Sequence, residues 1–150
     1  MRFMFFVLVT IALSACKVQT IQFPNPVENV SMGMEFKTLF KARPGMTIVN
    51  SVGETPYREF QQMINKNGIK EIHFYIPKKG NMQLYQVKLW FTDAEKAKTM
   101  AKTFFGQPKK NKNEWIAQTS EGDELEVVLK NATLNICSKD PVTTVSLPTE

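Results

Sequence analysis

The sequence offers few side chains that could act as a nucleophile or a general base. Its only histidine, His73, lies inside an apolar, alternating segment with no serine or cysteine beside it. A Ser-His-Asp arrangement would need distant partners that no motif marks. No glycine-rich loop precedes an expected helix in phosphate-binding form. We therefore expect a protein without enzymatic activity and without a bound cofactor.

Metal ligands are equally sparse. The two cysteines, Cys16 and Cys137, and the single histidine are not arranged at CxxC or HxxxH spacing. Four acidic residues surround one expected turn: Glu121, Asp123, Glu124 and Glu126. This cluster lacks the spaced oxygen ligands and the terminal glutamate of a calcium loop. We predict a solvated hairpin tip at this turn and no metal site.

Cys16 itself follows a segment with the layout of a secretion signal. Arg2 opens the chain, and residues 3–13 carry no charge. The stretch is shorter than the ~20 apolar residues that span a bilayer. Leu13-Ser14-Ala15-Cys16 resembles the lipobox of bacterial lipoproteins. The resemblance implies that residues 1–15 are a signal peptide and that Cys16 becomes the lipid-modified first residue, carrying diacylglycerol and palmitate.

The residues after the cysteine indicate a tether. Residues 16–30 are mostly polar, and Pro24 and Pro26 interrupt regular structure. Lys17 rather than an aspartate follows the cysteine, which resembles the default routing of Gram-negative lipoproteins to the outer membrane. The resemblance implies anchoring by lipid in that membrane, facing the periplasm.

If Cys16 is lipidated, the second cysteine, Cys137, has no intramolecular partner. We interpret Cys137 as a small buried side chain, with intermolecular pairing as the alternative.

Charge is unevenly distributed along the chain, whose formal net charge is +5. Residues 66–112 contain 11 lysines against three acidic residues, and residues 113–150 contain seven acidic residues against two lysines. If these blocks lie apart in the fold, the surface is dipolar and attracts an anionic partner. Peptidoglycan, lipid head groups and acidic proteins are the anions that an exported protein meets, and nucleic acid is not expected.

The first half of the domain is expected to contain two helices and one strand. Residues 31–42 fit a short helix, although the spacing of Met34, Phe36 and Phe40 also fits a strand. Residues 46–52 form a β-branched strand. Thr55 and Pro56 have the residue types of a helix start, so we predict a helix from there to the Asn67-Gly68 pair.

The second half combines one helix with antiparallel strands. Residues 72–76 and 84–91 alternate as a hairpin around the loop that contains Lys78 and Lys79. Thr92 and Glu95 predict a capping box at the start of a helix that Gly106 ends. Residues 115–119, 125–129 and 133–137 predict three more strands.

This order predicts an α+β fold: a ferredoxin-like split βαβ sandwich over residues 31–138, with extra C-terminal strands. Both helices would cover one face of an antiparallel sheet. The other face would carry an aromatic and basic group of side chains: His73, Tyr75, Gln86, Lys88 and Trp90. Two alternatives stay open for this face, exposure for binding or cover by residues 31–42. Residues 139–150 are expected to form a flexible tail.

A second resemblance concerns residues 46–119. The expected βαββαβ order, and the segment 84–91 followed by an alanine-rich capped helix, resemble the SPOR domains that bind peptidoglycan. Trp90 stands where that family usually has a glycine. The resemblance implies a peptidoglycan-binding module in the cell envelope.

The sequence therefore predicts a non-catalytic lipoprotein with one small domain. We expect an accessory or immunity factor that binds an envelope protein, with peptidoglycan binding as the alternative. The candidate binding residues are Tyr75, Lys78, Lys79, Lys88 and Trp90.

Overall fold

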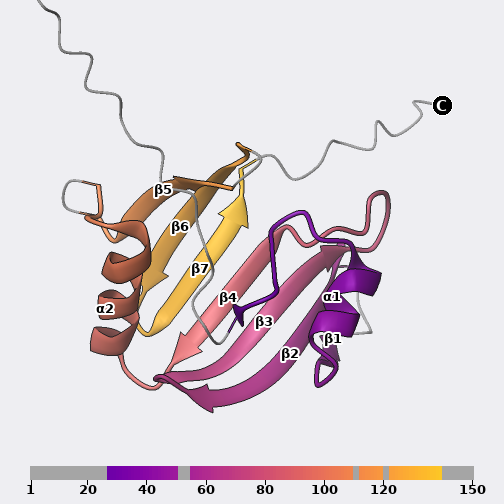
Figure 1. Cartoon of the computed structure of the whole chain (residues 1–150), viewed down its shortest axis with the longest axis horizontal. Helices are drawn as coiled ribbons and strands as arrows, with labels where there is room; N and C mark the ends of the chain where they lie inside the picture. The colour runs from indigo at the N-terminus through magenta and orange to yellow at the C-terminus, as the bar shows by residue number, and fades with distance from the viewer. Residues whose placement is uncertain (1–26, 51–54, 110–111, 120–121, 140–150) are drawn as a thin grey trace, which may run out of the picture.

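Alternating apolar residues build one antiparallel sheet of seven strands in the computed structural model (Figure 1), which describes residues 27–50, 55–109, 112–119 and 122–139. The elements in chain order are α1 (Phe36–Ala42), β1 (Thr47–Asn50), β2 (Tyr57–Lys66), β3 (Ile69–Pro77), β4 (Gln86–Phe91), α2 (Ala94–Phe105), β5 (Glu114–Gln118), β6 (Glu124–Lys130) and β7 (Thr133–Ser138). The predicted α+β class is confirmed.

The sheet consists of two similar halves. Each half begins with a helix and continues as an antiparallel meander, β1 to β4 after α1 and β5 to β7 after α2. The strand order is β1-β2-β3-β4-β7-β6-β5, so the last strands of the two meanders pair at the centre. The edges are β1 and β5.

The helix predicted after Thr55 is wrong, because these residues form strand β2. The apolar residues of this segment match a helical spacing, but Phe60 alone is buried, opposite Phe74 of β3. Asn67 and Gly68 adopt positive φ values of 53° and 80° and close a two-residue hairpin instead of ending a helix. The split βαβ arrangement is therefore not confirmed, and the sheet is larger than that fold requires.

The two helices form where the sequence indicates, with one local difference. Helix α1 confirms the helical interpretation for residues 36–42 only, since residues 31–35 form a turn and an isolated bridge. Leu39 is the buried residue of α1. Helix α2 begins after Asp93, whose Oδ1 accepts a hydrogen bond from the Lys96 backbone N–H at 2.8 Å. The predicted cap at Thr92 is wrong, because Asp93 is the last residue with extended backbone before the helix.

A single apolar core lies on one side of the sheet. Its large buried side chains come from the strands, from α1 and from the segment before it; among them are Val27, Leu39, Ile72, Phe74, Leu89, Val127 and Ile136. Ala97 and Ala101 pack α2 on the same side. In Figure 1 the segment 27–34, coloured indigo, crosses the sheet between the two helices.

Both described helices and the segment before α1 pack on the core side, so the opposite side of the sheet carries no described helix. We call this surface the open face. Residues 31–42 pack on the core side, so the alternative in which they cover His73 and Trp90 is wrong. The expected division of β4 is confirmed: Val87 and Leu89 are buried in the core, and Trp90 is exposed on the open face.

Candidate functional site

Strand register places the predicted aromatic and basic side chains together on the open face. His73 pairs with Lys88, Glu71 with Trp90 and Tyr75 with Gln86. Strand β2 adds Glu59 opposite Tyr75 and Gln61 opposite His73. Glu59 and Gln61 were not predicted as part of this face, because the apolar spacing of their segment indicates a helix.

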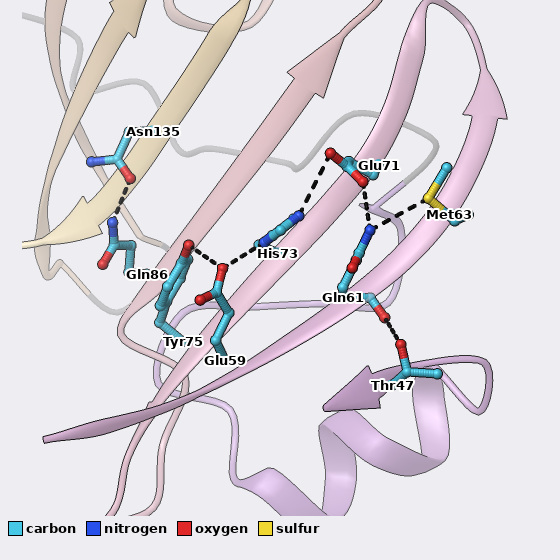
Figure 2. A network of polar contacts seen from close by, with 9 residues as sticks. All are labelled: Thr47, Glu59, Gln61, Met63, Glu71, His73, Tyr75, Gln86 and Asn135. Atoms are coloured by element: carbon cyan, nitrogen blue, oxygen red, sulfur yellow. Dashed lines mark hydrogen bonds and ion pairs between the residues drawn. The ribbon is translucent and has the colours of Figure 1, made fainter. Parts of the chain in front are cut away.

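Glu59 is the centre of a polar cluster on the open face (Figure 2). Its Oε1 lies 2.6 Å from His73 Nδ1 and accepts a 2.7 Å hydrogen bond from the Tyr75 hydroxyl. Burial acts to raise the Glu59 pKa, but the hydrogen bonds to His73 and Tyr75 and the nearby charge of Lys88 outweigh it and lower the pKa. An ionised carboxylate only accepts, so His73 Nδ1 is the donor.

His73 is held between carboxylates of two strands. Its Nε2 is buried, makes no hydrogen bond with any described residue, and lies 3.8 Å from Glu71 Oε1. Glu71 accepts a 2.5 Å hydrogen bond from Gln61 Nε2, and the Trp90 ring lies 5.7 Å from the imidazole. Among the residues that the structure describes, the partners of the two ring nitrogens are carboxylates and not nucleophiles.

Tyr75 lies on the open face but is buried, so it supports neighbouring side chains and is not accessible to a partner. Only 4% of the residue is exposed, and its ring packs edge-on against Tyr57. Burial and the neighbouring Glu59 raise the Tyr75 pKa, which keeps the hydroxyl protonated as a donor. Lys88 Nζ lies 4.7 Å above the ring, within cation–π range.

Three large apolar side chains of the open face are exposed instead: Met63, Trp90 and Ile116, with 52%, 39% and 43% of their surface accessible. They come from β2, β4 and β5, and so span most of the sheet. Aromatic residues and methionine are enriched at protein–protein interfaces relative to the rest of a protein surface. Trp90 is thus the predicted residue best placed to contact a partner.

The open face is more acidic than the sequence analysis expected. Its strand positions carry five glutamates, Glu59, Glu71, Glu114, Glu124 and Glu126, against Lys88 and Lys130. Glu124 is ion-paired with Lys139. The expected aromatic character is present, but the expected basic character is confined to these two lysines.

The two predicted loop lysines lie apart from Trp90. Lys78 and Lys79 follow β3, beyond the Tyr75 end of the open face, whereas Trp90 lies at the other end of β4. Lys109 and Lys112 precede β5 and lie at the end of the sheet opposite Lys78. The lysine-rich loops therefore do not form one patch.

Cys137 also lies on the open face. It pairs with Gln86 in the sheet and is half-buried, so its interpretation as a core side chain is wrong. The buried residues of the same strand, Leu134 and Ile136, alternate with it. Burial raises the pKa of the thiol, and the charge of Glu126 acts in the same direction. Next to Cys137, Gln86 Nε2 donates a 2.6 Å hydrogen bond to Asn135 Oδ1.

Two residues that the sequence analysis considered lie outside the described residues. Cys16 and Glu121 are among the residues that the structure does not describe. Among those it does describe, no three histidine, cysteine or acidic residues are grouped as metal ligands. Within the same residues, no helix has the length and apolar character needed to cross a bilayer.

Comparison with known proteins gives no family assignment. No protein-family model matches the chain, and no curated protein or solved structure shows significant similarity to it.

Proposed function

We propose that this protein is a non-catalytic lipoprotein of the cell envelope that binds a protein partner through its open face. Lipid on Cys16 anchors it in the outer membrane, and residues 17–26 tether the domain on the periplasmic side. The expected tether of residues 16–30 is too long at its end, because Val27 and Val30 are buried in the core of the domain. The domain acts as an accessory subunit of an envelope complex or as an immunity factor.

One observation supports this proposal best: a broad sheet face bears exposed apolar side chains and an excess of glutamates, and no described helix covers it. Tryptophan is enriched among the residues that contribute most to the free energy of protein binding, and Trp90 is the exposed aromatic residue of this face. The excess negative charge favours a partner whose matching surface is basic. The proposal of a non-catalytic role is supported by His73, whose Nδ1 bonds Glu59 and whose Nε2 is buried.

The test is a pull-down with the immobilised full chain from a detergent-solubilised envelope extract that contains sacculi. We expect one dominant protein, with a basic surface, to be recovered by the wild type and lost from a Met63→Ala/Trp90→Ala variant. Ile48→Ala is the matched control, because Ile48 is also half exposed but belongs to edge strand β1, in register with the core residue Phe60. Equal recovery by all three proteins would exclude the open face as the binding surface.

A second candidate function, peptidoglycan binding, is favoured by the exposed indole of Trp90. An indole near the Gln86–Asn135 amide pair and Lys88 has the stacking and hydrogen-bonding groups that sugars use. The βαββαβ order that underlies the resemblance to SPOR domains is absent, since β2 replaces the first helix. Co-sedimentation with purified sacculi tests this candidate, and binding that persists in Trp90→Ala would count against it.

A further inference from the structure

The helix-bearing side of the domain carries the opposite charge to the open face. Helix α1 contains Lys37 and Lys41 and no acidic residue. Helix α2 contains Lys96, Lys98 and Lys102 against Glu95 alone. All five lysines are exposed. Because both helices pack on the core side of the sheet, the fold separates a basic helical surface from an acidic sheet surface.

Most of these lysines are available to an external anion. Lys96 is paired with Asp93 at 3.3 Å, whereas the other four form no ion pair with a described residue. On α1, exposed Phe40 lies between Lys37 and Lys41 in sequence, with 47% of its surface accessible. An aromatic side chain among lysines on an exposed helix is typical of segments that lie in the head-group region of a membrane.

The described part of the chain begins on this same side. Its first residue, Val27, is fully buried in the core layer that the helices cover. Ten residues lie between Val27 and Cys16, which makes eleven residue steps along the chain. At ~3.3–3.6 Å per step, a fully extended chain spans at most roughly 36–40 Å. An anchor at Cys16 would therefore keep the side on which Val27 lies within about 40 Å of the bilayer.

We propose that the helix-bearing side is a membrane-facing surface that binds the head groups of anionic phospholipids. This inference rests on the proposed anchoring by Cys16 and adds an orientation to it. Lysines within a Debye length of an anionic surface are attracted to it, and the glutamates of the open face are repelled. The domain thus lies with α1 and α2 toward the lipid and presents its open face to the periplasm.

The test measures lysine accessibility on the anchored protein. Protein purified from membranes is reconstituted into phosphatidylglycerol-containing vesicles and into matched phosphatidylcholine vesicles. It is then labelled with an amine-reactive reagent and mapped by mass spectrometry. We expect labelling of Lys98 and Lys102 to fall several-fold in the anionic vesicles and to recover in high salt. Lys130 on the open face is the internal control and should label equally in both.

A charge-reversed variant sharpens the test. In Lys98→Glu/Lys102→Glu, the protection of Lys37 and Lys41 by anionic vesicles should be lost, whereas Lys130→Glu should retain it. Equal labelling in both vesicle types, with the protein still attached, would overturn this inference and leave the anchor intact. Failure to associate with either vesicle type would overturn the anchor itself. Protection by added sacculi but not by lipid would assign the surface to the cell wall instead.

Discussion

Glu59 shows how one carboxylate organises the polar centre of the open face. It bonds His73 on β3 and the Tyr75 hydroxyl, and the charge of Lys88 on β4 lies close enough to affect its pKa. These groups are largely buried, so each needs a partner to offset the loss of water. The cluster therefore couples strands β2, β3 and β4 at the surface that is proposed to bind a partner.

Removing this carboxylate should destabilise the fold. Glu59→Ala leaves the Tyr75 hydroxyl and His73 Nδ1 without their acceptor, and we expect the free energy of unfolding to fall by about 1–3 kcal/mol. Glu126→Ala on the same face is the control; Glu126 is exposed, and the change should stay within ~0.5 kcal/mol. Urea denaturation measures both. Equal effects of the two substitutions would show that the cluster contributes nothing specific.

The lowered pKa of Glu59 also predicts a pH dependence. A carboxyl group whose folded pKa is lower than its unfolded value, near 4.5, stabilises the folded state above that unfolded value. This contribution is lost as the pH falls through the lowered folded pKa. The difference in unfolding free energy between wild type and Glu59→Gln should therefore shrink as the pH falls below the unfolded value. A difference that stays unchanged as the pH falls there would show that folding does not lower the Glu59 pKa.

At the scale of elements, the β2–β3 hairpin forms the longest pair of strands in the first half of the sheet. Its turn needs a positive φ at Gly68, and an added Cβ there would lie 2.6 Å from Lys96 Cδ on α2. The same glycine accepts a backbone hydrogen bond from Thr92, just before that helix. The turn thus joins the hairpin to the start of α2.

Gly68→Ala should cost more stability than a comparable glycine substitution elsewhere. The left-handed conformation alone costs about 1–2 kcal/mol for a residue with a Cβ. Gly33→Ala is the matched control, because Gly33 has φ 79° and no atom within 4 Å of its added Cβ. Both variants should lower the midpoint of chemical denaturation, Gly68→Ala by the larger amount. A smaller effect at Gly68 would show that the Lys96 side chain moves aside without cost.

At the scale of the whole molecule, the sheet divides two surfaces of opposite charge. The basic and acidic blocks of the chain predict a dipolar surface. In the structure the dipole has a different origin, because strands of both halves place glutamates on the open face and both helices carry exposed lysines on the other side. A lipid anchor and a partner would thus contact opposite sides of the domain.

The proposed anchor makes a prediction for the intact protein. Cys16→Ala removes the only thiol that the lipobox resemblance assigns to lipid, so the protein should leave the membrane fraction. Lipid burial contributes about 0.8 kcal/mol per CH₂ group, so wild-type protein should stay attached through a carbonate wash. Immunoblots of washed membranes measure the distribution. Cys16→Ala protein that resists the same wash would contradict lipid anchoring, and Cys137→Ala, which should behave as wild type, is the control.

Local sequence patterns determined much of this architecture. Period-two alternation predicted β3, β4, β6 and β7, and apolar periodicity between Thr92 and Gly106 predicted α2. These patterns succeed because each strand or helix buries one set of side chains at its own period. The placement of His73, Tyr75, Lys88 and Trp90 on one sheet face follows from the same alternation.

Three features depend on tertiary structure: the strand β2, the polar cluster around Glu59 and the separation of charge across the sheet. The residues from Tyr57 to Lys66 match a helical spacing, yet they form a strand. The Asn67-Gly68 turn reverses the chain, so these residues pair with the backbone of β3 along its length. That pairing brings Glu59 to His73 and completes the polar cluster, which no local pattern encodes. The charge separation across the sheet likewise depends on which side both helices cover, and this is set by packing between residues far apart in the chain.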